Sequence, residues 1–506
     1  MLDAEALYSR AFKAYRGGDK SGAEADLEAA LALSPRDPRA ELLKGVVHDK
    51  GDGPVGLALV EDAVHRDPGN AEAWYNLGVF HSERGQMAEA LAAYERAAAL
   101  DPTHIDTLNN GCELLRRFDR FETAMTWADR QLQLGAKSWA AHLNRAVCLL
   151  HLRRFDEAEA AFQAALAIDP TRPIVRWEQF PMFLHQERFA EAWAAFEDRF
   201  ACGHLNGVHH YPFPQPLWRG EPLAGRHILI HNEQGLGDQL MFASALGEVV
   251  AEAKNVSLVA APELVALFKA SFPTVQVLPA RFGRFAGDHP VPDWIAQVAD
   301  ADYQLPIGGL MHRLRTSPES FANPGKYLRP SDAARARWPA PAKPTAVRVG
   351  VCWASNPALF RHDSSRRAVK KSMALETLAP LADVKGVELI SVLNWRVDPM
   401  PAALQGKLRD VFADLKCLDD TAALIETLDV VITVDTAVAH LAGALGKRTW
   451  MLLHDYADCR WGLTPDHSYW YADMRLFRQT VAGDWDSVVA EVVAELAREA
   501  QASAAT

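Results

Sequence analysis

One short glycine-containing stretch has residue types that could bind a ligand and move a proton. Residues 233–239, Glu-Gln-Gly-Leu-Gly-Asp-Gln, come at the end of the first apolar run of the α/β part, which begins at His227, and open a helical pattern. Gly235 and Gly237 would let the backbone approach a ligand, and a helix N-terminus favours negative charge. Asp238, in the first turn, is placed either as a general base facing a cleft or as a helix-capping acid. The stretch lacks the third glycine of a dinucleotide fingerprint, which disfavours a Rossmann dehydrogenase.

A second stretch, residues 433–446, combines the end of an apolar run with the start of a helix. Asp435 ends the run and Thr436 can cap the helix that follows. Ala437 and further small residues would leave the first amides of that helix open to a phosphate. His440, one turn later, either contacts the same ligand or packs inside the helix layer. The spacing alone leaves both interpretations open.

A basic stretch follows a third apolar run. It spans residues 356–372 and contains Arg361, Arg366, Arg367, Lys370 and Lys371. Charge runs usually form solvated faces, but this one comes at the carboxyl end of a predicted strand, where open α/β sheets bind ligands.

Metal chemistry has little support in the sequence. Asp300 and Asp302 have the spacing of a metal-nucleotide site, but the apolar segment 303–307 follows at once, so we expect a turn that enters a strand. The six cysteines are never closer than 36 residues and offer no ligand spacing. We therefore expect no metal and no cofactor.

The elements that would carry these stretches differ between the two parts of the chain. The first part repeats with a period of 34 residues, clearest in residues 71–104, where Trp74, Gly78, Tyr94 and Pro102 follow the tetratricopeptide pattern. The period predicts about six repeats over residues 4–206, each a pair of antiparallel helices, stacked into a superhelix that binds a protein or peptide.

Three asparagines recur at one position of this repeat. Asn76, Asn110 and Asn144 are each 34 residues apart on the predicted first helix of a pair. An amide both donates and accepts, so a ladder of them could bind the backbone of an acceptor peptide. The alternative, that asparagine is simply common at this position, is equally favoured.

Short apolar runs alternate with helical stretches in the second part. The runs 227–233, 255–262, 275–280, 347–355, 388–394, 430–435 and 449–453 predict parallel sheets. We expect an α-helical repeat domain at 1–206, a Pro-rich linker at 207–225, two Rossmann-like α/β domains at 226–335 and 345–482, and a closing helix and tail at 483–506.

Composition narrows the class of protein. Acidic residues outnumber basic ones, for a net charge of −12, which argues against a broad nucleic-acid-binding face. The N-terminal residues lack the pattern of a secretory signal, and no stretch is apolar enough to span a membrane. We expect a cytoplasmic protein.

The stretches 231–243, 349–357, 371–372, 420–447 and 470–479 together resemble the GT-B glycosyltransferases of glycosyltransferase family nine, the lipopolysaccharide heptosyltransferase group. With a tetratricopeptide array in front, the chain is similar to bacterial repeat-fused glycosyltransferases, including those that glycosylate flagellin.

This resemblance implies a GT-B fold and specific roles for the residues described above. Asp238 would remove the proton of the acceptor hydroxyl. Asp435, Thr436, Ala437 and His440 would lie at the sugar and phosphates of a nucleotide-sugar donor. Lys371 would lie near the phosphates, with Arg367 as its rival because the basic stretch is longer than the family pattern.

The sequence analysis thus predicts a metal-independent glycosyltransferase that moves a sugar from a nucleotide sugar to Ser or Thr of a protein acceptor such as flagellin. Two alternatives remain: an inactive scaffold whose GT-B part only binds a ligand, and a transferase acting on lipopolysaccharide or another glycan.

Overall fold

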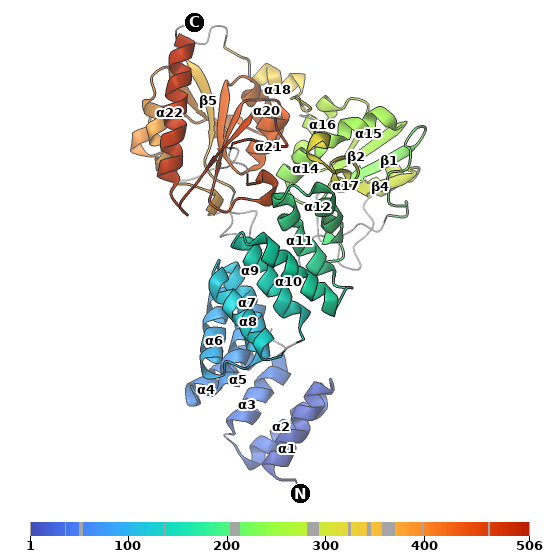
Figure 1. Ribbon diagram of the computed structural model, residues 1–506, viewed down its shortest axis with the longest axis vertical. Helices are drawn as coiled ribbons and strands as arrows, with labels where there is room; N and C mark the ends of the chain where they lie inside the picture. The colour runs from blue at the N-terminus through green and yellow to red at the C-terminus, as the bar shows by residue number, and fades with distance from the viewer. Residues whose placement is uncertain are drawn as a thin grey trace. The chain divides into compact units, whose positions relative to one another are not determined.

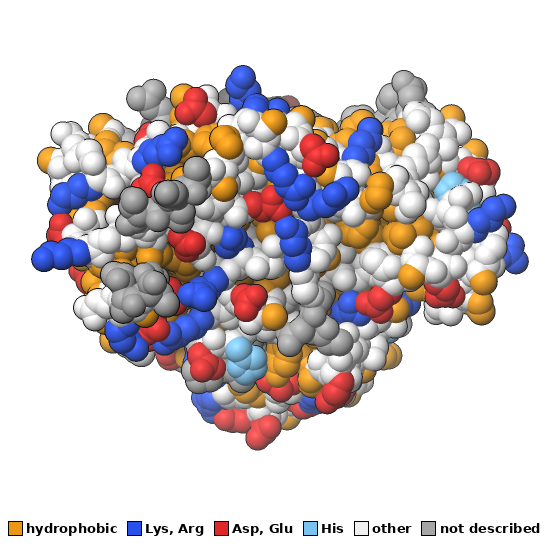
Figure 2. Space-filling view, turned by 90° about the horizontal axis from the view of Figure 1, so that it is seen from above, with side chains coloured by type: hydrophobic (Ala, Val, Ile, Leu, Met, Phe, Trp, Pro, Cys, Tyr) orange, Lys and Arg blue, Asp and Glu red, His pale blue; other side chains and the backbone are white. Residues whose placement is uncertain are grey.

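The computed structural model describes most of the chain. The described residues are 2–35, 37–49, 54–135, 137–202, 213–280, 293–321, 325–341, 346–356, 370–393, 395, 399–463 and 466–504. The chain forms two compact units, Met1–Val175 and Arg176–Thr506 (Figure 1). Figure 2 shows basic and acidic side chains interspersed over the face in view, without a broad surface of one sign.

The first unit is built from successive pairs of antiparallel helices. They are α1 (Ala4–Arg16), α2 (Lys20–Leu33), α3 (Pro38–Asp49), α4 (Pro54–Arg66), α5 (Ala71–Glu83), α6 (Met87–Leu100), α7 (Ile105–Arg117), α8 (Phe121–Gln133), α9 (Trp139–His151) and α10 (Phe155–Ile168). Side chains of Asn70 and Ser138 cap α5 and α9 by accepting from backbone amides. The helical repeats that the period predicts are present.

Four of the turns between paired helices repeat with the same period as the sequence. Gly85, Asp119, Arg153 and Glu187 follow one another at 34 residues, and their φ angles are 74°, 58°, 57° and 60°. This left-handed conformation carries no penalty for glycine but is uncommon for other residue types. The same turn geometry therefore recurs with four different residue types at this position.

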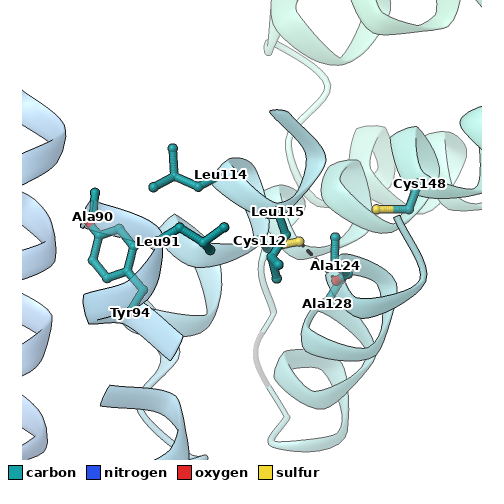
Figure 3. Packing of buried hydrophobic residues seen from close by; sticks show 9 residues of the cluster. All are labelled: Ala90, Leu91, Tyr94, Cys112, Leu114, Leu115, Ala124, Ala128 and Cys148. Carbon is teal, nitrogen blue, oxygen red and sulfur yellow. Dashed lines mark hydrogen bonds between the residues drawn. The ribbon is translucent and has the colours of Figure 1, made fainter. Parts of the chain in front are cut away.

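Small residues let the paired helices approach. A Cβ atom added at Gly78 of α5 would lie 2.5 Å from the ring of Tyr94 on α6. One core cluster continues through four helices, with Ala90, Leu91 and Tyr94 from α6, Cys112, Leu114 and Leu115 from α7, Ala124 and Ala128 from α8, and Cys148 from α9 (Figure 3). Small side chains on one helix thus make room for large ones on the next, as in tetratricopeptide repeats.

The second unit begins with two further helices, α11 (Pro173–His185) and α12 (Phe189–Phe196), the boundary between the units falling in the first turn of α11. A short 3₁₀ helix, η1 (Glu197–Arg199), ends this segment. Two parallel sheets follow, with helices against their faces (Figure 1).

The first sheet has the strand order β3-β2-β1-β4, and the second has the order β10-β9-β8-β5-β6-β7. The strands of the first sheet are β1 (His227–His231), β2 (Asn255–Ala260), β3 (Gln276–Pro279) and β4 (Tyr303–Pro306). Those of the second are β5 (Val347–Cys352), β6 (Val387–Ser391), β7 (Leu408–Arg409), β8 (Val430–Val434), β9 (Thr449–Leu453) and β10 (Met474–Arg478). The remaining helices are α14 (Leu236–Phe242), α15 (Leu246–Glu252), α16 (Val265–Ser271), α17 (Gly309–Leu314), α18 (Asp332–Arg337), α20 (Leu418–Glu426), α21 (Ala437–Ala444) and α22 (Trp485–Ala504).

Each sheet has one position, set by its strand order, at which α/β proteins usually bind ligands. The chain direction across the first sheet reverses between β1 and β4, and across the second sheet between β5 and β8. Such reversals open a crevice at the carboxyl ends of the strands. The stretches that the sequence analysis singled out follow β1, β5 and β8.

The Asp300–Asp302 segment is a turn that enters β4. Asp302 accepts hydrogen bonds from the backbone amide of His227, at 2.8 Å, and from Arg226, at 3.0 Å. Its carboxylate therefore joins the starts of β1 and β4. Among the described helices, none combines the length and apolar composition needed to cross a membrane.

Candidate active site

The loop after β1 is fixed before it reaches Asp238. Glu233, only 1% exposed, accepts two hydrogen bonds from the guanidinium of Arg199 in η1, at 2.7 and 2.8 Å, and one from the amide of Gly308. Gln234 then takes a left-handed φ of 58°. A non-glycine residue in this region costs roughly 1–3 kcal/mol and persists where the surroundings hold it in place.

Asp238 caps the helix that it begins. It is the third residue of α14, and its Oδ2 accepts from the backbone amide of Gly235 at 2.9 Å. Gly235 has an ordinary extended conformation, with φ of −80°, so its backbone does not require glycine. The capping role that the sequence left as an alternative is therefore present, and the second carboxylate oxygen decides what else Asp238 can do.

That second oxygen binds a residue that the sequence analysis missed. Nη1 of Arg460 donates to Oδ1 of Asp238 at 2.6 Å, and Nε of Arg460 donates to Asp458 at 2.9 Å. Arg460 belongs to a short 3₁₀ helix, η10 (Cys459–Trp461), after β9. In the sequence, Arg460 is visible only as part of a Cys-Arg-Trp segment shortly after a predicted strand. No local pattern indicates that it pairs with Asp238, 222 positions earlier.

Asp435, at the end of β8, pairs with Lys371. Nζ of Lys371 lies 2.5 Å from Oδ2 of Asp435, a contact between charges without the alignment of a hydrogen bond. Burial alone would raise the pKa of Asp435, but Lys371 and Arg460 lower it below its ordinary value. Burial alone would lower the pKa of Lys371, and Asp435 and Asp458 raise it instead. Both groups are therefore charged at neutral pH.

The charged groups form one cluster at the carboxyl ends of β1, β8 and β9. Burial opposes the charge on Arg460, but Asp458, Asp238 and Asp435 hold its pKa well above the ordinary value. The pKa of Asp458 is lowered because Arg460 and Lys371 outweigh its burial. Three carboxylates thus face two cations among the described residues.

His440 lies behind this cluster rather than on its surface. It is 2% exposed, its Nδ1 lies 2.9 Å from the hydroxyl of Tyr471, and its ring stacks on Trp461 at 5.1 Å between centroids. Burial, reinforced by Arg460, lowers its pKa to about 4. The ring is neutral near pH 7 and packs α21 against α14, where a Cβ at Gly237 would lie 2.8 Å from it.

The N-terminus of α21 lacks a side-chain cap. Thr436 occupies the N-cap position, but its hydroxyl lies 3.4 Å from that of Thr433 and 3.6 Å from the sulfur of Cys352. Capping by the Thr436 side chain, which the sequence suggested, is therefore wrong. Thr436 and Ala437 are half-buried, at the edge where Asp435 lies. Arg361, Arg366 and Arg367 lie outside the described residues.

One helix connects the loop after β1 with the second sheet. Trp193 of α12, 1% exposed, packs edge-on against Phe242 of α14, at 6.5 Å, and Trp470, at 6.0 Å. With Arg199 and Glu233, this contact makes α12 and η1 part of the framework that positions Asp238.

The three asparagines of the first unit have different surroundings. The side-chain amide of Asn76 donates to the carbonyl oxygen of Glu72 in its own helix, at 2.9 Å. The side-chain oxygen of Asn110 accepts from the side-chain amide of Asn109 at 3.4 Å. Asn144 is 6% exposed and accepts from Arg116 at 2.7 Å.

These asparagines are therefore not a uniform ladder. A peptide could take hydrogen bonds from Asn76 and Asn110 by local rearrangement, whereas Asn144 would first have to leave Arg116. A pocket beside Asn110 has a volume of about 270 Å³ and is lined by residues that include Val79, Met87 and Leu114.

Comparisons with known proteins place relatives along most of the chain. Protein FlbA of Caulobacter vibrioides is 27% identical over 446 residues, which cover 85% of this chain and 73% of that protein. A PEX5-related protein of Rattus norvegicus is 39% identical over 59 residues, covering 12% of this chain and 10% of the relative. A solved tetratricopeptide repeat protein from Parabacteroides merdae has a TM-score of 0.33 and 23% identity, covering 39% of this chain and 79% of that chain.

The family models identify the repeats directly. Tetratricopeptide repeat models match residues 49–105 and residues 139–172. Both segments lie in the first unit and consist of the paired helices described above. The chain therefore carries tetratricopeptide repeats followed by a region of parallel α/β sheets.

Proposed function

We propose that this protein is a glycosyltransferase that transfers a sugar from a nucleotide-sugar donor to Ser or Thr of a protein. The proposal is carried by the charged cluster that joins the two sheets. Asp238, after β1 of the first sheet, is hydrogen-bonded to Arg460, and Asp435 is paired with Lys371, the last three of these residues following strands of the second sheet. A base on one side and cations on the other are the two aids that such a transfer needs.

The proposed chemistry divides these residues by role. Asp238 takes the proton of the acceptor hydroxyl, because an alcohol is a weak nucleophile until a base removes that proton. The open N-terminus of α21 and Lys371 bind the diphosphate of the donor and stabilise the charge that it gains on leaving. These roles agree with those implied by the resemblance to GT-B glycosyltransferases.

The tetratricopeptide repeats supply the argument for a protein acceptor. Arrays of this kind bind extended peptides or other proteins through their stacked helices. We propose that the first unit binds the acceptor polypeptide, and that flagellin is the first acceptor to test, since the chain resembles repeat-fused transferases of that class. A cytoplasmic location is part of the same proposal.

Intact-mass measurements test donor and acceptor together. Flagellar and co-purifying proteins would be compared in cells with and without the gene, and again after complementation with an Asp238→Asn variant. We expect one acceptor to lose a mass equal to a whole number of sugar residues, restored by the wild-type gene alone. Unchanged masses in every fraction, with no transfer from a panel of nucleotide sugars in vitro, would overturn the proposal.

One observation favours a second function. Both oxygens of Asp238 already have partners, one in the helix cap and one in the pair with Arg460. An inactive scaffold whose α/β region only binds a nucleotide would use the same contacts. Binding of a nucleoside diphosphate without transfer to any acceptor would support it.

A further inference from the structure

Arg460 is the residue on which the charged cluster converges. Its Nη1 donates to Asp238 at 2.6 Å and its Nε donates to Asp458 at 2.9 Å. Its backbone is held as well, since its amide donates to Asp458 at 3.1 Å and its carbonyl oxygen accepts from the indole of Trp470 at 2.9 Å. The guanidinium therefore has a fixed position and direction.

One edge of this guanidinium is left for a ligand. Among the residues that the structure describes, none accepts a hydrogen bond from Nη2 of Arg460. The side chain is 22% exposed, so it is not sealed inside the protein. Arginine presents its five N–H donors as a planar fork that suits carboxylate and phosphate oxygens.

The surroundings of that edge favour an anion. Trp461, next in the chain, is stacked on His440, and its indole nitrogen is buried without a hydrogen-bond partner. Asp435, which precedes the uncapped start of α21, pairs with Lys371 and also interacts electrostatically with Arg460. Arg460 thus interacts both with the proposed base and with the carboxylate that pairs with Lys371.

We propose that Arg460 is a further catalytic residue, which holds Asp238 through Nη1 and binds a phosphate oxygen of a nucleoside diphosphate through Nη2. The inference rests on the proposed glycosyl transfer and adds the group that links its two halves. One cation then holds the base and binds the leaving group, so that a single side chain links the two reacting sites.

The step balances without any further reactant. The acceptor oxygen forms a bond to the anomeric carbon while the bond from that carbon to the phosphate oxygen breaks. The hydroxyl proton moves to Asp238, and the bonding electron pair leaves with the nucleoside diphosphate. Arg460 faces both sites of changing charge, since Asp238 loses its negative charge as the phosphate gains one.

Calorimetric titration with nucleoside diphosphates tests the inference on the whole protein. UDP, GDP, ADP, CDP and dTDP would each be titrated into wild-type protein and into Arg460→Lys. Lysine keeps the positive charge but cannot reach Asp238, Asp458 and a phosphate at once. We expect the diphosphate that binds the wild type to bind Arg460→Lys about 10-fold more weakly or worse, as for loss of one charge-assisted hydrogen bond.

Two further variants separate ligand binding from a structural role. Asp458→Asn removes a negative charge beside the guanidinium, so the diphosphate should bind more tightly even where the melting temperature falls. Arg475→Lys, on β10 and paired with Glu491 and Glu495, is the matched control and should bind as the wild type does. A purely structural network would instead weaken binding in Arg460→Lys and Asp458→Asn alike, in step with their melting temperatures.

The outcomes distinguish this inference from the proposed function. Equal affinities of wild type and Arg460→Lys for the bound diphosphate would overturn the role of Arg460 and leave glycosyl transfer standing. Parallel loss in Arg460→Lys and Asp458→Asn would do the same. Failure of every nucleoside diphosphate to bind the wild type would overturn both.

Discussion

At the scale of single residues, Asp238 combines a capping role with a place in the charged cluster. Each carboxylate oxygen has two lone pairs, so one hydrogen bond on each oxygen leaves acceptor capacity. A cap and a base are therefore compatible in one carboxylate. A substitution of Asp238 that keeps the helix cap but removes sugar transfer would show that the carboxylate acts as a base as well as a cap.

Replacing Asp238 by asparagine makes that distinction. Asparagine caps helices as well as aspartate does, so the amide of Gly235 keeps its acceptor and the fold should persist. The amide cannot take a proton, and transfer should fall by about 10²- to 10⁴-fold. Transfer rates and binding of the nucleoside diphosphate would be measured on the purified variant, with Asp302→Asn as the control in the start of the first sheet. A rate near that of the wild type would reduce Asp238 to a helix cap.

The pair of Lys371 and Asp435 predicts an effect on stability. Lys371→Met leaves the carboxylate of Asp435, 7% exposed, without its nearest cation. Breaking such a buried pair costs about 3–5 kcal/mol of unfolding free energy. The double variant Lys371→Met with Asp435→Asn removes both charges and should recover most of that loss. Equal losses in the single and double variants would mean that the pair contributes nothing as a pair.

The pH dependence of this pair follows from the pKa of Asp435. That pKa is lowered in the folded protein, so the pair's contribution is complete above the unfolded value of about 3.9 and declines as pH falls through the folded value. The difference in melting temperature between wild type and Lys371→Met should therefore be constant from pH 7 to pH 5 and shrink at lower pH.

At the scale of secondary-structure elements, the close approach of α14 and α21 depends on glycine. A Cβ at Gly237 would lie 2.8 Å from the ring of His440, which is itself fixed between Trp461 and Tyr471. Gly237 was predicted to admit a ligand, and in the structure it admits a neighbouring helix. The two helices carry Asp238 and the uncapped N-terminus, so their spacing sets the width of the candidate site.

Gly237→Ala should therefore destabilise the protein by about 1–3 kcal/mol, the usual cost of overpacking. Gly247→Ala, in α15, is the matched control because a Cβ there meets no atom within 4 Å. Alanine favours the helix by up to about 1 kcal/mol over glycine, so this control should melt at or above the wild-type temperature. Denaturant unfolding followed by circular dichroism measures both. A Gly237→Ala protein as stable as its control would show that the helices can separate freely.

The segment that joins the last repeat helices to the first sheet predicts a second pH effect. Glu197 of η1 contacts Arg199, Arg313 and His312, which together outweigh its burial and lower its pKa to about 2. Glu197→Gln should cost up to about 3 kcal/mol at pH 7. Because the folded pKa is below the unfolded one, this contribution is complete above about pH 5 and is lost as pH falls towards 2. A melting difference that grows on acidification would contradict the prediction.

Helices and strands could be predicted from the sequence where a pattern of neighbouring residues indicates them. Seven strands follow from apolar runs, and the paired helices follow from a period that several residue types share. Strand β7, only Leu408–Arg409, is too short to leave such a pattern. Arg460, Asp458 and Trp193 were missed because their contacts join segments far apart in sequence. The carboxylate of Asp238 was identified, but its arginine partner required the fold.

At the scale of the whole molecule, two units of different architecture share one chain. The tetratricopeptide repeats have protein recognition as their usual role, and the α/β region holds the charged cluster. This division predicts that changes in the repeats alter how well an acceptor binds without altering how a nucleotide binds. The asparagines are the residues on which to test that division.

The double variant Asn76→Ala with Asn110→Ala is the sharpest test of acceptor recognition. Both amides have local partners that a peptide could replace, and each lost hydrogen bond is worth about 0.5–1.5 kcal/mol net. Acceptor binding should weaken by roughly 5- to 100-fold, seen as a higher KM with kcat nearly unchanged. Asn144→Ala is expected to act differently, because it removes a largely buried side chain that accepts a hydrogen bond from Arg116, and it lowers the melting temperature instead. Nucleotide affinity should stay constant in all of these variants. Acceptor pulldown and steady-state kinetics decide the matter, and unaltered acceptor binding by the double variant would mean that the asparagines only build the repeat.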